Sequence, residues 1–199
     1  MTAPVMTVSV QVPAPDEKEI RRYCACPNGL DEVLSSCLSE LDGLTYNVGY
    51  RVFPVKQTDT GLDLGFAATG SRDLQKALTG CDRVLLFAAT VGLLPDRLIA
   101  KYSRLSPAKA LFVQAIGTER VEALCDAFCK EQKGYYTAEG AVLCPRFSPG
   151  YGDLPLSLQK EVFAALDCER QLGLTLNESL LMTPSKSVTA LAGIKEAFG

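Results

Sequence analysis

The hydrophobic and polar positions of the first forty residues predict one strand followed by two short helices. Thr7-Val-Ser-Val-Gln-Val12 alternates with the period of a half-buried strand and ends at Pro13, so we expect a strand at the edge of a sheet. Asp16 to Arg22 has the acidic first turn of a helix. Asp31 to Leu41 carries apolar residues at helical spacing, and Gly43 follows just beyond its end.

The next forty residues predict a hairpin, a capped helix and a buried strand. Tyr46 to Val55 and Leu62 to Phe66 are expected to be strands that form a hairpin around the polar connection Asp59-Thr60-Gly61. Ser71 to Leu78 is a helix that begins with a serine cap. Asp82 to Thr90 is almost continuously apolar, as in a central strand that is buried on both faces.

The longest predicted helix follows a shorter one over Asp96 to Tyr102. Ser106 and Pro107 form a cap and first-turn pair, and the helical pattern reaches about Lys130. Gly117 lies inside it, where it allows another element to pack closely. The expected buried face consists of Leu111, Ala115, Val121, Leu124, Cys125 and Phe128.

The C-terminal third predicts an amphipathic helix and two strand-like arms. The helix covers Ser157 to Leu172, and the arms are Glu178 to Met182 and Ser187 to Leu191, around Pro184-Ser185-Lys186. This pairing would place Glu178 and Ser179 near the sheet. Helices and strands alternate irregularly along the chain, so we expect an α+β fold with a mostly antiparallel mixed sheet and flanking helices.

Composition limits the classes of function. The 199 residues are 47% hydrophobic, which is enough for one substantial core, and we expect a single domain over residues 1–199. A net charge of −3 without a Lys/Arg-rich stripe argues against a nucleic acid as partner. No apolar run reaches the roughly 18 residues of a membrane span, and Met1-Thr-Ala-Pro lacks the features of a signal peptide. We therefore expect a cytoplasmic protein with no membrane contact.

Cysteine and histidine usage limit the chemistry further. The eight cysteines are dispersed, so we expect most of them to be reduced and buried. Cys125 and Cys129 lie one helical turn apart, which suits either a metal or an apolar helix face, and we favour the second. The chain has no histidine, which excludes Ser-His-Asp and Cys-His catalysis and any His-ligated metal within it. We expect no metal site and no catalytic side chain.

The segment Pro145 to Pro155 is the strongest candidate for a binding site. Its prolines fix φ, and Gly150 and Gly152 can adopt positive φ, so the segment is expected to be a rigid loop. Arg146 offers a planar set of donors that suits a carboxylate or phosphate, and free N–H groups near the glycines can accept an anion. The alternative is an ordinary proline-rich turn whose arginine pairs with a neighbouring Asp or Glu.

A family resemblance supports the binding site. Arg146-Phe-Ser-Pro-Gly150-Tyr151 resembles the S-adenosylmethionine-binding motif in the activation domain of cobalamin-dependent methionine synthase, Arg-x-x-x-Gly-Tyr. The segment from Leu174 to Val188 is similar to a second motif of that family. Val84 to Gly92 and Gly117 to Asp126 resemble stand-alone proteins built on the same domain. The resemblance covers roughly residues 70–193 and is weak over residues 1–69.

The resemblance implies a methionine synthase activation domain-like fold that binds S-adenosylmethionine and reactivates an oxidised corrinoid by reductive methylation. Because the chain lacks histidine, the cobalamin would be carried by a partner, either a corrinoid-binding protein or a methionine synthase without its own activation domain. A flavodoxin or ferredoxin-type protein would donate the electron. The implied cofactor-binding residues are Arg146, Ser148, Gly150, Tyr151, Gly152, Asp153, Glu178 and Ser179.

The chain also departs from the family pattern. It has no tryptophan, and the family's aspartate for the ammonium group, which lies in a Trp-containing segment, has no counterpart. Asp153 and Glu178 are candidates for that role, and either can instead cap a helix or bind backbone amides. Two other functions therefore stay open: a docking scaffold for a corrinoid protein that no longer binds S-adenosylmethionine, and a methyltransferase that acts on another small nucleophile.

Overall fold

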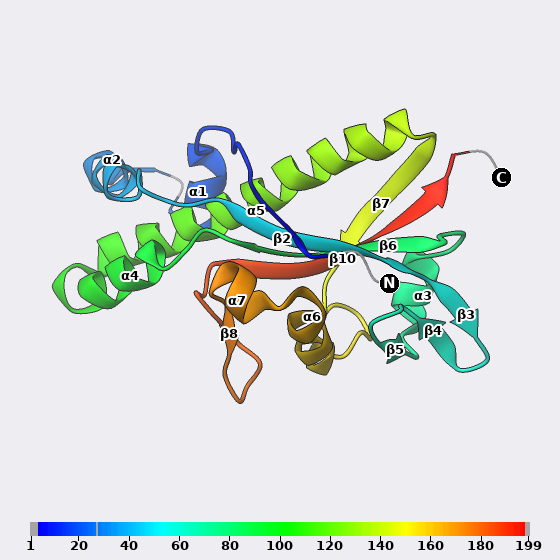
Figure 1. Cartoon of the computed structure of the whole chain (residues 1–199). Coiled ribbons are helices and arrows are strands. Elements are labelled where there is room, and N and C mark those ends of the chain that lie inside the picture. Colours follow the sequence, from blue (N-terminus) through cyan, green and yellow to red (C-terminus); the bar gives the residue numbers. More distant parts are fainter. Residues whose placement is uncertain (1–3, 27, 198–199) are drawn as a thin grey trace.

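The protein is built on a five-stranded antiparallel sheet with helices on both faces and at one end (Figure 1). The computed structural model describes residues 4–26 and 28–197, so the expectation drawn from Met1-Thr-Ala-Pro concerns residues that lie mostly outside this range. In spatial order the strands are β1 (Met6–Ser9), β2 (Asn47–Pro54), β6 (Arg83–Thr90), β10 (Ser187–Glu196) and β7 (Ala141–Phe147). The predicted α+β class, the edge position of β1 and the central position of β6 are confirmed.

Helix α5 (Pro107–Ala138) crosses one face of the sheet (Figure 1). It begins where predicted, because Ser106 Oγ accepts a hydrogen bond from the Lys109 amide at 3.4 Å, but it runs eight residues past Lys130. The prediction that Leu111 is buried was wrong, since Leu111 is 47% exposed and Phe112 is buried instead. The shared core between helix and sheet includes Phe87, Leu85, Leu124, Phe128, Leu143 and Ile194.

The other face of the sheet is covered by α3 (Arg72–Ala77), the short 3-10 helix η1 (Leu156–Leu158), α6 (Gln159–Leu166) and α7 (Cys168–Leu172). The single helix predicted over Ser157 to Leu172 is wrong. Asp167 has φ +49° and ends α6, after which the chain turns and begins α7. A left-handed residue cannot continue a right-handed helix, and the composition of this segment did not mark it.

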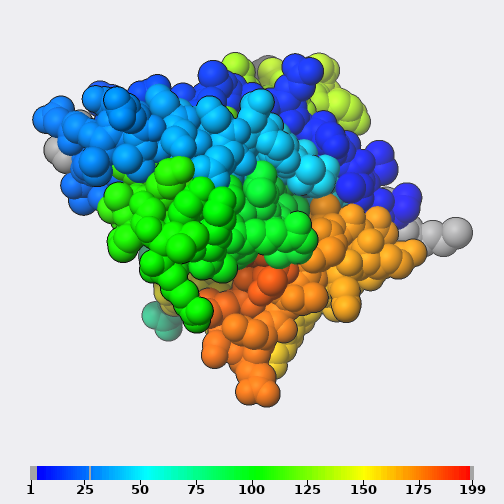
Figure 2. All heavy atoms as spheres, turned by 90° about the vertical axis from the view of Figure 1, so that its left-hand side faces the viewer, coloured from blue at the N-terminus to red at the C-terminus, as the bar shows by residue number. Residues whose placement is uncertain are grey.

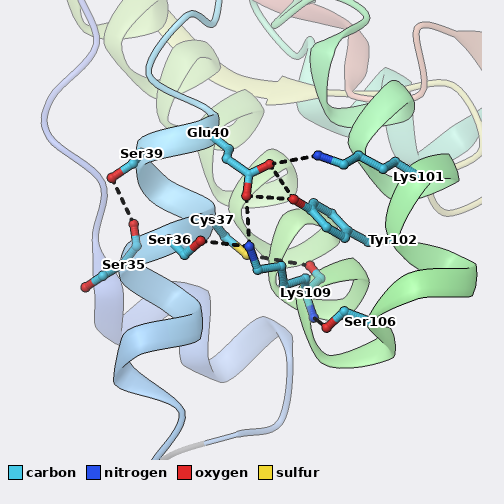
Figure 3. Close-up of polar contacts among 9 residues, drawn as sticks. All are labelled: Ser35, Ser36, Cys37, Ser39, Glu40, Lys101, Tyr102, Ser106 and Lys109. Carbon is cyan, nitrogen blue, oxygen red and sulfur yellow. Dashed lines mark hydrogen bonds and ion pairs between the residues drawn. The ribbon is translucent and has the colours of Figure 1, made fainter.

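Helices α1 (Glu17–Tyr23), α2 (Asp31–Glu40) and α4 (Leu94–Leu105) pack on the first turns of α5 and form a third core. A polar cluster joins them (Figure 3). Glu40 of α2 accepts hydrogen bonds from Tyr102 of α4 at 2.6 and 2.7 Å and from Lys109 of α5 at 2.9 Å. The Tyr102 hydroxyl, followed by Lys109, lowers the pKa of Glu40 to about 2. The polar groups of this cluster satisfy one another's hydrogen bonds, so we interpret the cluster as structural.

A buried ion pair attaches the N-terminal arm, residues 10–16, to α5. Arg120 donates to the Pro13 carbonyl at 2.5 Å and to the Ala14 carbonyl at 3.2 Å, and it pairs with Glu119 at 2.5 Å. Glu119 in turn accepts from the Asp16 amide at 3.3 Å. Because both charged groups are fully paired in a buried position, removal of one partner would leave the other uncompensated.

Two small sheets complete the fold. Strands β3 (Lys56–Thr58), β4 (Gly61–Asp63) and β5 (Ala68–Thr69) form the first, so the turn at Asp59-Thr60 is confirmed, but the strand before it is β3 and not β2. Strands β8 (Thr175–Leu176) and β9 (Met182–Thr183) form the second. This hairpin projects from the body of the molecule (Figure 1 and Figure 2).

The strand-like arm predicted over Glu178 to Met182 is wrong in its first part. The Leu180 amide donates to the Asn177 carbonyl at 2.9 Å, and Leu180 has φ +62°, so the chain turns sharply here. Glu178 and Ser179 lie in the exposed turn of the β8–β9 hairpin and not next to the main sheet. In the part of the chain that the structure describes, no helix has both the length and the apolar character needed to cross a bilayer.

Candidate functional site

A β-bulge determines the direction of Arg146. Strands β7 and β10 change register between Ala192, which pairs with Arg146, and Ile194, which pairs with Leu143. Two residues of β7 therefore lie opposite one residue of β10. In a regular strand, positions 143 and 146 would face opposite sides of the sheet, but the extra residue turns both toward α5. The bulge thus moves the guanidinium from the α6 side of the sheet to the α5 side.

Arg146 meets two carboxylates on α5. Its Nη2 atom donates to Glu122 Oε2 at 2.7 Å and to Asp126 Oδ1 at 3.0 Å. Burial alone would lower the pKa of Arg146, but the hydrogen bond and charge of Glu122 raise it, so the guanidinium stays charged. The side chain remains 26% exposed. The alternative that this arginine pairs with nearby carboxylates is therefore confirmed for the ion pairs themselves.

A cavity of about 450 Å³ adjoins Arg146, within the usual range for small-molecule sites. Its polar lining includes Arg146, Glu122, Ser148 and Gln159, contributed by β7, α5, the loop after β7 and α6. The remaining residues are mostly apolar and come from the loop, the β8–β9 hairpin and the start of β10: Pro149, Leu156, Leu180, Leu181, Met182, Ser185, Ser187, Val188 and Thr189. Segments far apart in the sequence thus build one concave site.

The loop after β7 is held by its own backbone. Gly150 N donates to the Leu154 carbonyl at 2.9 Å, and Tyr151 N donates to the Ser148 carbonyl at 3.1 Å. Gly150 has φ +87°, a conformation that favours glycine. The prediction of a shaped loop is confirmed. The expected anion-accepting backbone is not, because the Gly150 and Tyr151 amides already have partners within the loop.

Asp153 connects this loop to α3. Its carboxylate accepts hydrogen bonds from the Ser71 hydroxyl, from Arg72 N at 2.8 Å and from Asp73 N at 3.2 Å. The Ser71 hydroxyl, with these amides, lowers the pKa of Asp153. Gly152 lies against the same helix, where an added Cβ would come within 2.5 Å of Asp73 Oδ2. Asp153 therefore caps a helix, which was one of its two expected roles.

Three other candidate residues lie outside the cavity lining. The Tyr151 ring is 69% exposed and packs edge-on against Phe147, with 5.3 Å between ring centroids. Glu178 and Ser179 occupy the exposed hairpin turn, and the cavity lining begins two residues after Glu178, at Leu180. Of the eight candidates, the structure brings Arg146 and Ser148 to the cavity itself.

Two acidic residues of the site were missed at the level of sequence. Glu122 and Asp126 are one helical turn apart on α5, and both contact Arg146. Their i, i+4 spacing within the segment Gly117 to Asp126 was a usable signal. The pattern does not indicate which strand these carboxylates contact. Arg146 points toward α5 only because of the bulge in β7.

Gln159 of α6 was also missed, and it is held in place by the surrounding backbone and side chains. Its Oε1 accepts a hydrogen bond from Thr189, and its Nε2 donates to the Leu180 carbonyl at 3.2 Å. The amide is buried and has both ends paired, so its orientation is fixed at the cavity wall. It links β10, α6 and the β8–β9 hairpin.

Lys186 lies beside the site but on the α5 side, away from the cavity lining. It is 6% exposed, and its Nζ donates to Thr118 Oγ1 at 2.9 Å. An added Cβ at Gly117 would meet Lys186 Cγ at 2.9 Å, which confirms the close packing expected at this glycine. Burial lowers the pKa of Lys186. Over residues 4–26 and 28–197, no three metal-ligating side chains cluster together.

A comparison with known proteins identifies a solved structure with the same fold. No family model matches the sequence, and no curated protein does. Among solved structures, the crystal structure of the MetH reactivation domain bound to AdoHcy superposes with a TM-score of 0.67 at 17% identity, over 100% of this chain and 80% of that one. The protein therefore has the fold of a methionine synthase reactivation domain.

Proposed function

We propose that this protein binds S-adenosylmethionine in the cavity beside Arg146 and supports reductive methylation of a corrinoid that a partner protein carries. The observation that carries the proposal is the meeting of one guanidinium and two carboxylates at the wall of a 450 Å³ cavity. The fold is that of a reactivation domain whose crystal structure holds AdoHcy, which is S-adenosylmethionine without its transferable methyl group.

The donors of Arg146 fit an amino-acid carboxylate. Both Glu122 and Asp126 contact the same nitrogen, Nη2, and within the described residues no group accepts from the Nη1 or Nε atoms of Arg146. A planar guanidinium with two remaining nitrogens can hold a carboxylate while keeping its ion pair with α5. Glu122 also lines the cavity, so it is our candidate for the ammonium group that the sequence left unassigned.

The rest of the cavity fits an uncharged nucleoside. Leu156, Leu180, Leu181, Met182 and Val188 give it apolar walls, and the fixed Gln159 amide adds a polar point between them. A few placed polar groups in a mostly apolar cavity are typical of small-molecule sites. S-adenosylmethionine combines a charged amino acid, a sulfonium and an adenosine, so its parts match this distribution.

The absence of histidine suits the proposed chemistry. Bound S-adenosylmethionine would supply a methyl group whose transfer to reduced cobalt needs no proton transfer by the protein. Arg146, Glu122 and the loop would hold the donor in line with its acceptor and exclude water. Because the chain has no imidazole, the cobalamin would arrive on a corrinoid-binding protein or on a methionine synthase without its own activation domain. A flavodoxin or ferredoxin-type donor would supply the electron.

A second candidate function is a docking scaffold that contacts a corrinoid protein without binding S-adenosylmethionine. The ion pairs of Arg146 and the internal hydrogen bonds of the loop favour it, since both satisfy the site without a ligand. Tyr151, Glu178 and Ser179 also lie away from the cavity lining. The two functions differ in a measurable property, which is affinity for S-adenosylmethionine.

Isothermal titration with S-adenosylmethionine separates these functions. We expect saturable binding by the wild type and a loss of about 1.5–3 kcal/mol for Arg146→Ala, which is a weakening of roughly tenfold to a hundredfold. Arg170→Ala is the matched control, because Arg170 also pairs with a carboxylate, Asp167, but lies on the exposed surface of α7. No heat at millimolar ligand would overturn the first proposal and leave the scaffold.

The corrinoid step is tested by the absorption spectrum of cobalt. The protein, S-adenosylmethionine and a reductant are mixed with candidate proteins that carry Co(II) corrinoid. We expect conversion to methylcobalamin only when all four components are present. Transfer of labelled methyl to a small nucleophile instead would favour the third function, a methyltransferase with another acceptor.

A further inference from the structure

Two cysteines meet at the bulge of β7. Cys81 lies between α3 and β6, and Cys144 lies in β7, next to Pro145. Their sulfur atoms are 3.7 Å apart although 63 residues separate them in the chain. Both side chains are half-buried, and both residues are free thiols. In the described part of the protein, no other two thiols are in sulfur–sulfur contact at this range.

A glycine on the strand between them makes this contact possible. An added Cβ at Gly193 of β10 would lie 2.5 Å from Cys81 Sγ and 2.8 Å from Leu78 Cδ2. The Cys81 sulfur therefore occupies the space above β10 that a side chain at position 193 would fill. Gly193 is also the residue opposite the bulge, between the two paired positions Ala192 and Ile194. A glycine in a strand interior often marks such a close approach.

We propose that Cys81 and Cys144 are an oxidation site, which a peroxide converts to an intramolecular disulfide across β10 and a thiol reductant restores. Cys144 attacks one oxygen of the peroxide, which gives a sulfenic acid at Cys144 and one water. The Cys81 sulfur then attacks that sulfenic acid, and a second water leaves. Two thiols and one hydrogen peroxide thus yield one disulfide and two waters.

The surroundings of the two thiols indicate which of them reacts first with the peroxide. Burial, followed by the proximity of Cys144, raises the pKa of Cys81 to about 12, so Cys81 is a poor first nucleophile. Cys144 is partly exposed on β7, which is an edge strand of the sheet, so a small oxidant can reach it. The sulfur atoms then have to approach by about 1.7 Å to reach the disulfide length of about 2.05 Å. Side-chain rotation and small backbone shifts provide movements of this size.

Peptide mapping of the wild type tests the proposal directly. The protein is treated with hydrogen peroxide, the remaining thiols are alkylated, and tryptic peptides are analysed by mass spectrometry. We expect a linked pair of peptides, 77–83 and 134–146, each of which contains one cysteine. Dithiothreitol should separate them. Sulfinic or sulfonic acid at Cys144 without any linked pair would overturn the proposal.

Variants and unfolding measurements complete the test. Cys81→Ser and Cys144→Ser should abolish the linked pair. Cys129→Ser should retain it, although Cys129 and Cys144 both line a cavity of about 410 Å³ between α5 and β7. If a linked pair of peptides persists in Cys81→Ser, Cys81 is not the partner of Cys144 and the proposal is wrong. If a variant fails to fold, thermal unfolding of the wild type decides: the oxidised form should melt several degrees higher, because the link closes a long loop. An unchanged melting temperature after peroxide treatment would contradict the disulfide.

Discussion

Arg146 of β7 contacts Glu122 of α5 at 2.7 Å because the bulge before it reverses the alternation of the strand. The pair joins the strand that carries the candidate motif to the helix that crosses the sheet. The same two side chains border the cavity, so the contact is both a structural link and a part of the proposed site.

The charge of Glu122 should matter more for binding than for folding. In Glu122→Gln the negative charge disappears while the shape is kept, so we expect affinity for S-adenosylmethionine to fall about tenfold or more. The Arg146–Glu122 pair is partly exposed, so the free energy of unfolding should change by less than about 1 kcal/mol. Titration calorimetry and urea unfolding measure the two quantities. Glu161→Gln, at an exposed position of α6, is the control. Equal affinities of the wild type and Glu122→Gln would remove Glu122 from the site.

Gly150 should be needed for the shape of the loop. Its φ of +87° is unfavourable for alanine, and an added Cβ would lie 3.2 Å from Leu156 Cδ1. We expect Gly150→Ala to lower the free energy of unfolding by about 1–2 kcal/mol. Gly134→Ala is the opposite control, since Gly134 lies in α5 with open space around it and should gain up to about 1 kcal/mol. If urea denaturation shows that both variants change the free energy of unfolding in the same direction, this account is wrong.

Glu40 should make folding sensitive to acid. Its folded pKa of about 2 lies below the unfolded value of 4.5, so its contribution is present above pH 4.5 and is lost as the pH falls toward 2. Wild-type stability should therefore fall over this range more steeply than that of Glu40→Gln. Glu131→Gln, an exposed position on α5, should follow the wild type. Parallel curves for the wild type and Glu40→Gln would exclude the effect.

Lys186 should penalise folding at neutral pH. Burial lowers its folded pKa below the unfolded value of 10.5, so the unfolded chain binds more protons and stability rises as the pH increases toward 10.5. Lys186→Met removes the buried charge and keeps the packing on Gly117, so we expect it to be more stable than the wild type at pH 7. Its advantage should shrink as the pH rises toward 10.5 in urea unfolding. A constant difference would mean that the ammonium group is fully compensated by Thr118 and Asp96.

Sequence patterns predicted most of the scaffold because local rules decide it. Ser71 and Ser106 cap the helices that follow them, and the apolar run that ends at Thr90 is the central strand. The points at which a helix ends or the chain turns were harder to predict. Asp167 and Leu180 adopt positive φ as non-glycine residues, and tertiary packing, rather than residue type, holds them there.

The candidate site was predictable in its first residue but not in its surroundings. Arg146 and Ser148, both from the motif, line the cavity. Glu122, Asp126 and Gln159 come from other elements, and their approach depends on the register between β7 and β10, which no local pattern specifies. Asp153 matched the motif region yet caps α3, since a carboxylate next to free helix amides binds them.

The bulge in β7 also means that strand register, and not only side-chain identity, defines this site. If β7 paired with β10 without the bulge, Arg146 would lie opposite Leu191 and its guanidinium would point toward α6, while the letters Arg-x-x-x-Gly-Tyr stayed unchanged. Glu122 and Asp126 would then lose their cation. The register between β7 and β10 is therefore a criterion by which relatives that keep this arrangement can be separated from those that keep only the motif.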